Sequence, residues 1–379
     1  MTIINSKNNK IENFDIRPEN SRSLPGHYYF DEEILAREMP AIFYRSWQYA
    51  GHVSMLAKPR DYIVRDIGDQ SVIILRDSNG ELRGFHNVCQ HRAHRLLEGE
   101  GRIKALITCP YHAWSYDMSG DLKRVPGEEN ALGLDTHGIC LKSVQVEQFL
   151  GFVFYNLDAT AESLAAQTGG EMEKEFRSFC PDPESLNRCY TKTYDVKANW
   201  KNVIENYSEC YHCPTSHPTL AQNALDMSDY KITVNKAYHH HNSGNRGDMQ
   251  GYDFDPGSAP RASEFGGWYI FPSVVFEFYP GGKLTVFHNV PAAPEETTQN
   301  IEWYLAGNQA TEEEQAIIDF VDVVRREDFP LVESVQRGLH SQGYTQGRFL
   351  IDKEHSYLSE HAVHDFQLRV LRALGDFEA

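Results

Sequence analysis

The stretch CQHRAHRLLEGEGRIKALITCPYHAW, residues 89–114, contains two short groups of cysteine and histidine. The first group, C-x-H, places Cys89 two residues before His91, and the second, C-x-x-H, places Cys109 three residues before His112. Seventeen residues separate the two groups. Two thiolates and two imidazoles in this order are a metal-ligand set. We therefore expect this segment to hold a metal centre and to determine the fold around it.

Two kinds of metal centre use such a set. Zinc would be bound tetrahedrally by all four side chains. A two-iron, two-sulfur cluster of the Rieske arrangement would place both cysteines on one iron and both histidines on the other. The cluster is favoured because each group offers one ligand to each iron, and because the flanking sequence predicts β-hairpins rather than a zinc-finger helix. The flanks also contain Tyr111 and Trp114, whose O–H and N–H groups could donate hydrogen bonds to the sulfides.

β-rich sequence surrounds this segment. YIVRDIGDQSVIILRDSNGELRGFHNV (62–88) predicts three strands, YDMSGDLKRV (116–125) a hairpin and FLGFVFYNL (149–157) a buried strand. Together they predict an all-β unit over residues 46–158. The preceding stretch 31–53 predicts a helix with an acidic cap. Its apolar face would consist of Ile34, Leu35, Met39, Ile42 and Phe43.

Residues 159–379 predict an α+β domain, in which helices pack on one side of an antiparallel sheet. Helical patterns cover about 161–178, 198–212, 311–340 and 358–376. Strand patterns lie near 186–196, 229–238, 267–279, 283–291 and 300–307. Residues 240–262, rich in Gly, Asn, Asp and Pro, predict a long loop. Residues 1–45 predict an arm and a helix that pack on this domain.

Composition narrows the class of protein. The 379 residues carry 36 basic and 54 acidic side chains, a net charge of −18, which disfavours nucleic acid and anionic membranes as partners. We find no apolar run long enough to span a bilayer, and the start MTIINSKNNKIENFD lacks the apolar core of a signal peptide. We therefore expect a cytoplasmic protein, whose seven cysteines stay reduced.

A second metal motif lies in ECYHCPTSHP (209–218). His212 and His217 form an H-x4-H pair, with carboxylates close by at Glu205 and Glu209. We expect the two histidines to project from the end of a helix and from the turn after it. Two imidazoles and one carboxylate on one face, with positions left open, are the ligands of mononuclear non-haem Fe(II) oxygenases.

The carboxylate ligand need not be local. We assign Asp328, in RREDFPLVESVQRGL (325–339), as the third ligand, with Asp322 as the next candidate. The alternative is that Asp328 caps the first turn of its helix, since a Phe-Pro pair follows it. The buried stripe of that helix would consist of Leu331, Val332 and Val335.

The same motif contains a C-x-x-C pair, Cys210 and Cys213, a spacing typical of zinc knuckles and redox dithiols. A redox dithiol usually follows a strand in a βαβ unit, and the sequence indicates no such unit here. We therefore expect both cysteines to pack as small apolar groups.

Together, the two metal motifs resemble those of the Rieske non-haem iron oxygenases, in particular their large (α) subunit. Within this family the chain is most similar to the branch that acts on quaternary ammonium compounds, such as carnitine monooxygenase and betaine demethylases. The runs NWKNVIENYSECYHCPTSHP, EDFPLVESVQRGLHSQGY and SEHAVHDFQ carry this likeness. Glu209 stands where ring-hydroxylating dioxygenases usually have aspartate, which we interpret as a marker of the branch.

The resemblance implies an all-β Rieske domain inserted before a catalytic domain of helix-grip (START-like) fold. It implies a [2Fe–2S] cluster on Cys89, His91, Cys109 and His112, and a mononuclear Fe(II) on His212, His217 and Asp328. A separate NAD(P)H-dependent flavin or iron–sulfur reductase would deliver electrons one at a time for the activation of O2. The family also forms trimers in which the cluster of one subunit lies next to the iron of its neighbour. We therefore expect a homotrimer in which His91 or His112 hydrogen-bonds to Glu209 across the interface.

The substrate is expected to be a quaternary ammonium or betaine-type compound such as carnitine or glycine betaine, which loses a methyl group or trimethylamine. Such a cation is bound by aromatic faces. The candidate residues for this aromatic box are Tyr207, Trp268, Phe271 and Phe276. No residue is assigned to the substrate carboxylate.

Two other functions remain open from the sequence. An aromatic ring-hydroxylating dioxygenase or O-demethylase could use the same scaffold with a flat apolar slot. A non-catalytic Rieske electron carrier, or a zinc-binding regulatory protein, would leave the second metal motif unexplained.

Overall fold

The computed structural model describes residues 11–244, 251–255 and 258–378. The chain divides into two compact units. The small unit contains Tyr44–Ala166 and Pro183–Arg188, and the large unit contains the remainder. The small unit therefore extends beyond the predicted β unit 46–158 at both ends.

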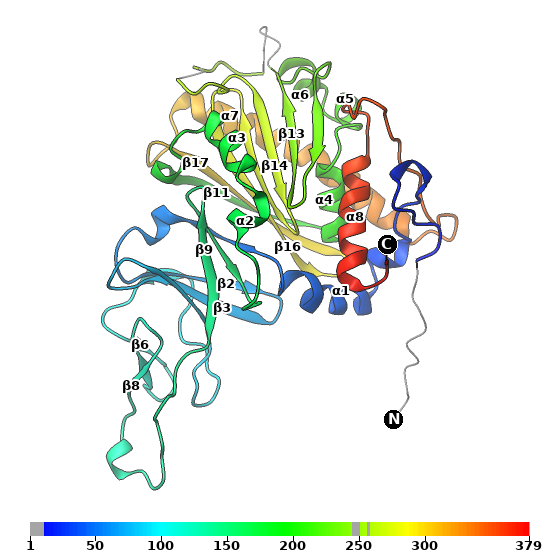
Figure 1. Cartoon of the computed structure of the whole chain (residues 1–379). Helices are drawn as coiled ribbons and strands as arrows, with labels where there is room; N and C mark the ends of the chain where they lie inside the picture. Colours follow the sequence, from blue (N-terminus) through cyan, green and yellow to red (C-terminus); the bar gives the residue numbers. More distant parts are fainter. Residues whose placement is uncertain (1–10, 245–250, 256–257, 379) are drawn as a thin grey trace. The chain divides into compact units, whose positions relative to one another are not determined.

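The small unit is built on β-strands (Figure 1). Seven strands form one sheet in the order β1-β10-β9-β4-β3-β2-β5. They are β1 (Gln48–His52), β2 (Asp61–Ile67), β3 (Gln70–Arg76), β4 (Leu82–His86), β5 (Glu100–Arg102), β9 (Ser143–Phe149) and β10 (Phe152–Asn156). A second sheet contains β6 (Ile107–Thr108), β7 (Ser115–Tyr116) and β8 (Leu122–Arg124). The predicted strands in 62–88, the hairpin in 116–125 and the buried strand in 149–157 are confirmed.

The helix predicted over 31–53 is shorter. Asp31 caps α1 (Glu32–Glu38) by accepting the N–H of Glu33, and one π-helical turn follows at Met39–Phe43. Residues 48–52 instead form β1, because their backbone pairs with β10 over Phe152–Tyr155. The helical prediction is therefore wrong beyond Phe43.

The large unit combines a seven-stranded sheet with helices. The sheet order is β11-β17-β16-β15-β14-β13-β12. Its strands are β11 (Asn187–Val196), β12 (Lys231–Val234), β13 (Tyr238–Ser243), β14 (Phe265–Ile270), β15 (Val274–Tyr279), β16 (Lys283–Ala293) and β17 (Glu296–Leu305). The helices are α3 (Glu171–Phe179), α4 (Trp200–Tyr207), α5 (Cys213–Ser216), α6 (Pro218–Asn223), α7 (Glu312–Leu339) and α8 (His361–Leu374), while α2 (Leu164–Thr168) crosses the boundary between the units. The α+β prediction is confirmed, but the expectation that the helices pack on one side of the sheet is wrong.

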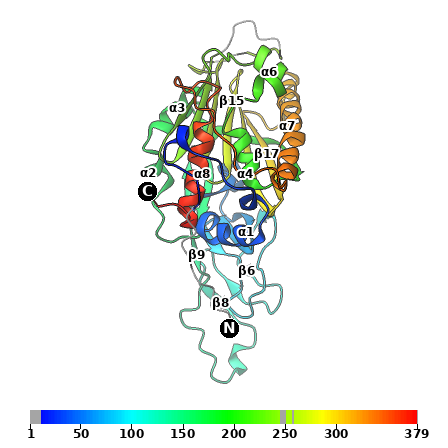
Figure 2. The ribbon, with the colours of Figure 1, turned by 90° about the vertical axis from the view of Figure 1, so that its right-hand side faces the viewer.

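Helices lie on both faces of this sheet. On one face, α3 packs Phe176 against Trp268 with ring centroids 5.2 Å apart. On the other face, Phe366 of α8 contacts Tyr269 at 6.1 Å. Residues 268 and 269 are adjacent on β14, and side chains alternate along a strand, so α3 and α8 must lie on opposite faces. In Figure 2, α4 lies between α8 and α7.

Two predicted segments differ in detail. The single strand predicted at 267–279 is a hairpin, in which β14 pairs with β15 across a turn at 271–273. The long loop predicted at 240–262 begins later, because β13 extends to Ser243. The parts of that loop at 245–250 and 256–257 lie outside the described residues.

A buried ion pair fixes the start of α4. Lys201 Nζ lies 2.6 Å from Glu38 Oε1, and both side chains are fully buried. The indole of Trp200 donates to the other carboxylate oxygen of Glu38 at 2.8 Å. Removing one partner of such a pair leaves an uncompensated buried charge, so the pair holds α4 in one position. None of the described helices is both long and apolar enough to cross a membrane.

Glu205, near the end of α4, belongs to a second buried network. Tyr29 donates its hydroxyl to Glu205 at 2.7 Å, and Gln367 donates its amide at 3.0 Å. Burial raises the pKa of Glu205 to about 7, although both hydrogen bonds act in the opposite direction. This carboxyl therefore takes part in packing α4 against its surroundings.

We predict that Glu205→Gln changes how stability depends on pH. The folded state keeps the Glu205 proton up to a pKa of about 7, whereas the unfolded chain releases it near the ordinary glutamate pKa of 4.5. The contribution of the protonated Glu205 carboxyl to the free energy of unfolding is therefore present at low pH and is lost as the pH rises through about 7. Because Gln stays neutral, the free energy of unfolding of the variant relative to wild type should increase by about 2 kcal/mol between pH 5.5 and pH 8. Urea denaturation at several pH values measures this difference, and a constant difference would contradict the prediction.

Candidate active site and metal centres

The predicted cluster ligands lie in two loops with the same backbone hydrogen bonds. In the first loop, the N–H of Cys89 donates to the carbonyl of His94 at 2.8 Å, and the N–H of Ala93 donates to the carbonyl of Cys89 at 3.0 Å. The second loop repeats this pattern with Cys109, Trp114 and Ala113 at 2.8 and 3.0 Å. Ala93 and Ala113 both have positive φ, 56° and 58°. Only the second loop joins a hairpin, β6–β7, since the first connects β4 to β5.

The four side chains of these loops fit a two-iron cluster. Cys89 and Cys109 are buried and carry free thiols. The rings of His91 and His112 lie toward the surface, 4.7 Å apart between centroids. Each loop therefore contributes one cysteine on the inner side and one histidine on the outer side. This separation matches a cluster with cysteines on one iron and histidines on the other.

Aromatic side chains support the two loops. Trp114 stacks on His91 at 4.7 Å, and Tyr111 lies against His112 at 3.7 Å. The hydroxyl of Tyr116 lies 3.3 Å from Cys89 Sγ and accepts the N–H of Gln90. Tyr116 is therefore a candidate donor to the cluster sulfur that sequence reasoning missed. Its sole sequence signal is its position two residues after Trp114.

The second motif converges on one buried point. His217 Nε2 lies 2.8 Å from Asp328 Oδ1 and 3.2 Å from His212 Nε2. The distance between His212 Nε2 and Asp328 Oδ1 is 3.5 Å. Within residues 11–244, 251–255 and 258–378, these three form the one group whose three ligand atoms all lie within 4.8 Å of one another. The arrangement is that of a two-histidine, one-carboxylate metal site.

Carboxylates orient both histidines. Glu209 Oε1 lies 2.6 Å from Nδ1 of His212, and its Oε2 accepts the backbone N–H of His212 at 3.1 Å. Glu327 Oε2 lies 2.8 Å from Nδ1 of His217. Each Nδ1 is therefore held by a carboxylate, so each Nε2 is free to bind a metal. Sequence reasoning missed Glu327, although its position directly before Asp328 was a usable signal.

The charges around this point favour a bound cation. Burial by itself would raise the pKa of Asp328, but hydrogen bonds from His212 and His217 and the charge of Arg325 hold it well below its usual value. Burial would lower the pKa of His212, but Asp328 and Glu209 raise it to about 9. The site therefore keeps an ionised carboxylate and attracts positive charge between the three side chains. A divalent metal ion fits this position, since it supplies that charge without a proton.

Several local predictions were wrong. The helix predicted over 198–212 is shorter, because α4 ends at Tyr207 and both Glu209 and His212 lie in the turn before α5. The alternative that Asp328 caps a helix is excluded, since Asp328 lies inside α7, which begins at Thr311 with a capping box. Of the predicted buried stripe on α7, Val332 is buried but Leu331 and Val335 are exposed.

The two cysteines of the second motif form a disulfide. Cys210 and Cys213 are joined across the turn that carries His212, with their Cα atoms 5.0 Å apart. This separation lies within the range that a disulfide requires. The expectation that both stay reduced and pack as separate apolar groups is therefore wrong. Cys210 and Cys213 lie on either side of His212, so the disulfide closes the turn that carries this predicted ligand.

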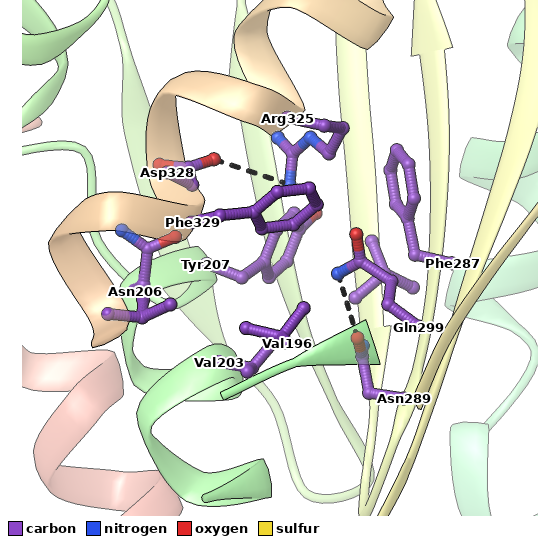
Figure 3. A pocket seen from close by; sticks show the side chains of 12 residues that line it. Val196, Val203, Asn206, Tyr207, Phe287, Asn289, Gln299, Arg325, Asp328 and Phe329 are labelled. Atoms are coloured by element: carbon purple, nitrogen blue, oxygen red, sulfur yellow. Dashed lines mark hydrogen bonds and ion pairs between the residues drawn. The ribbon is translucent and has the colours of Figure 1, made fainter. Parts of the chain in front are cut away.

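Two adjoining pockets open beside the predicted metal ligands, and both are lined by Asn206, Tyr207, Arg325 and Asp328. The one we call the metal pocket also contains His212, His217, Tyr230, Phe265, Glu277 and Tyr279. The one we call the amide pocket also contains Phe287, Asn289, Gln299 and Phe329 (Figure 3). The cavity is therefore lined by both aromatic rings and buried charges.

The predicted aromatic box is only partly present. Tyr207 lines both pockets. Trp268 and Phe276 are cross-strand neighbours, and both contact Phe176 of α3 on the opposite face of the sheet. Phe271 contacts Phe366 of α8 and lines neither pocket. The box is wrong for Trp268 and Phe276 because the alternation along β14 and β15 directs them away from the pockets, whereas Glu277 and Tyr279 line the metal pocket. It is wrong for Phe271 because this residue lies in the turn between the two strands.

Comparisons with known proteins agree with this arrangement. Residues 46–146 match the family described as Rieske [2Fe-2S] domain, and residues 183–376 match the family described as ring hydroxylating alpha subunit (catalytic domain). The carnitine monooxygenase oxygenase subunit of Escherichia coli (strain K12) is 36% identical over 368 residues, which cover 96% of this chain and 97% of that protein.

Solved structures give the same result. A quaternary ammonium Rieske monooxygenase in complex with L-carnitine matches with a TM-score of 0.85 and 33% identity, covering 96% of this chain and 99% of that one. A structure of such a monooxygenase, described with carnitine oxidation and inter-subunit electron transfer, matches with a TM-score of 0.86 at the same identity and coverage. The chain therefore belongs to the Rieske non-haem iron oxygenases, as an oxygenase subunit whose cofactors are a [2Fe–2S] cluster and a mononuclear iron.

Proposed function

We propose that this oxygenase oxidises a carbon next to the quaternary nitrogen of a betaine-type substrate such as carnitine. The carbon would gain a hydroxyl group from O2, two electrons and two protons, with water as the second product. The hydroxylated carbon would then become a carbonyl as its C–N bond breaks and a tertiary amine leaves. The observation that carries this proposal is a buried carboxylate, Glu277, among aromatic rings in the pocket of His212, His217 and Asp328.

The chemistry of that pocket suits a quaternary ammonium group. Such a cation has no N–H to donate, so it is bound by aromatic faces and by a carboxylate nearby. The rings of Tyr207, Tyr230 and Tyr279 line the metal pocket, and Tyr279 donates to Glu277 at 3.0 Å. Burial raises the pKa of Glu277, so a cation beside it favours the ionised carboxylate, which a neutral aromatic substrate would not. This favours a cationic substrate over the ring-hydroxylation alternative.

The protein residues would take the following roles. Cys89, Cys109, His91 and His112 would hold the cluster, and His212, His217 and Asp328 would hold the iron. When bound, the cluster supplies single electrons and the iron supplies O2 activation. Glu209 and Glu327 would keep the two histidines oriented, while the pocket aromatics exclude water and position the substrate.

The proposal includes partners. A separate NAD(P)H-dependent reductase would supply electrons, and we expect this exchange to occur in the cytoplasm. The relative described with inter-subunit electron transfer supports an assembly in which a neighbouring subunit's cluster serves each iron, and we propose that this assembly is a trimer. Glu209 would connect the two centres, because it binds His212 directly and is 14% exposed.

We predict that Cys109→Ala abolishes the Rieske cluster. Loss of one thiolate should remove the visible spectrum and both acid-labile sulfides from the purified protein, because the cluster needs four protein ligands. Cys140→Ala, in the same unit and half-buried, is the matched control and should keep both. A full spectrum in Cys109→Ala would show that the cluster ligands are assigned wrongly.

Asp328→Asn should remove the mononuclear iron and leave the cluster. The amide lacks the charge that balances the metal, so iron content should fall from three to two per chain and substrate oxidation should cease. Asp319→Asn, on the exposed side of the same helix, is the control. Retained iron and activity in Asp328→Asn would move the third ligand elsewhere, with Asp322 as the next candidate.

Glu209→Gln should separate electron transfer from metal binding. Glutamine keeps the size and one acceptor, so both metals should remain bound, but loss of the charge should slow reoxidation of the pre-reduced cluster roughly 10- to 100-fold. Single-turnover mixing with substrate and O2 measures this rate.

Glu327→Gln is the matched comparison for that experiment, because it removes the equivalent contact from His217. An equal slowing in both variants would mean that Glu209 acts only through the geometry of its histidine. Wild-type rates in Glu209→Gln would remove the proposed connection altogether.

A further inference from the structure

Arg325 is a buried cation without a hydrogen-bond partner among the residues that the structure describes. Its side chain is 12% exposed, and its Nε is fully buried and unpaired. Figure 3 shows the guanidinium between Asp328 and the rings of the amide pocket. A guanidinium has five N–H donors, and leaving them unsatisfied in a buried site is costly. The N–H of Arg325 Nε therefore has no acceptor among the described residues, and a group bound in the cavity could supply one.

The neighbouring carboxylates do not bind this guanidinium directly. Arg325 Nη1 lies 3.8 Å from Asp328 Oδ2, beyond hydrogen-bond distance, while Asp328 Oδ1 faces the two histidines. Glu277 accepts the hydroxyl of Tyr279. One face of the guanidinium is covered by Phe287, whose ring centroid is 4.7 Å away. The two carboxylates therefore balance the charge of Arg325 without accepting its N–H groups, which remain available to a bound ligand.

Both buried charges line the cavity. Glu277 lies in the metal pocket, whereas Arg325 lies where the metal pocket meets the amide pocket. The cavity therefore has a negative group among tyrosine rings and a positive group beside Phe287 and the amides. This charge pattern is complementary to a zwitterion. The negative group would face the ammonium end of the ligand, and the positive group would face its carboxylate end.

We infer that Arg325 binds the carboxylate of the substrate, so that the enzyme selects quaternary ammonium compounds that also carry a carboxylate. Arg325 is then a specificity-determining residue. It would distinguish a betaine or carnitine from choline, which has the same trimethylammonium group and a hydroxyl in place of the carboxylate. This inference rests on the proposed function, since it assumes a quaternary ammonium at the metal pocket.

A pair of ligands that differ only at the carboxylate tests the inference. L-Carnitine and L-carnitinamide share the trimethylammonium group and the chain, but the amide is uncharged at that end. We would measure the dissociation constants of both by titration calorimetry on the iron-loaded protein under argon. Wild type should bind L-carnitine roughly 10- to 100-fold more tightly than the amide, as expected for hydrogen bonds to a charged group.

Variants of Arg325 test whether this residue causes the preference for L-carnitine over L-carnitinamide. Arg325→Gln should bring the ratio of the two dissociation constants close to one, and Arg325→Lys, which keeps the charge but not the planar donors, should give an intermediate ratio. Arg326→Gln, the adjacent residue with an exposed side chain, is the matched control and should keep the wild-type ratio. Because the ratio is taken within one protein, general loosening of the pocket does not change it.

The outcomes separate the two claims. Equal binding of both ligands by wild type, or an unchanged ratio in Arg325→Gln, would overturn the role of Arg325 and leave the proposed function intact. Wild type that binds neither ligand would contradict the proposed function, and the inference with it. If Arg325→Gln does not fold, the wild-type ratio and that of Arg325→Lys still decide the question.

Discussion

The structure of the large unit depends on one buried carboxylate. Asp328 lies inside the long helix α7 with one oxygen against the imidazoles of His212 and His217. A carboxylate in such a place stays ionised only if positive charge lies beside it. Arg325 supplies part of that charge from one turn earlier on α7, and a metal ion bound between the three ligand atoms would supply the rest. Helix α7 carries Asp328 and Arg325, and the turn between α4 and α5 carries His212, so these elements bring the carboxylate and its partners together.

The surrounding fold makes that position rigid. Lys201 and Glu38 fix the start of α4, and the capping box at Thr311 fixes the start of α7. The disulfide across the turn restricts the segment that carries His212. Glu209 and Glu327 then determine the orientation of the two imidazoles. The two carboxylates act on the ligands directly, whereas the other contacts hold the elements beside them.

Sequence reasoning was strongest where spacing alone determines chemistry. The cysteine and histidine pairs at 89–112 and the histidines at 212 and 217 are local patterns, and the structure brings each set together. Asp328 could be proposed as a ligand, but the sequence left open a helix cap, because a Phe-Pro pair directly after an acid is also typical of a helix start. In the structure α7 continues through Pro330.

The side of a strand that faces the cavity could not be predicted. When 267–279 is taken as one strand, the sequence does not show which of its alternating side chains face the cavity. Trp268 and Phe276 were therefore placed in the pocket, and Glu277 was not. Arg325, Glu327 and Tyr116 act through contacts between distant parts of the chain. Local sequence marks such contacts only weakly, by the position of Glu327 beside Asp328 and of Tyr116 near Trp114, because a charged residue on a helix is usually solvated.

The most direct test of the account is to locate the iron atoms. Anomalous diffraction from crystals of the holoprotein, recorded on both sides of the iron absorption edge, shows where iron is bound. The account predicts a pair of peaks between Cys89, His91, Cys109 and His112, and a single peak in contact with Nε2 of His212, Nε2 of His217 and a carboxylate oxygen of Asp328. Absence of the single peak, its appearance at other ligands, or a signal at the zinc edge in place of iron would contradict the account.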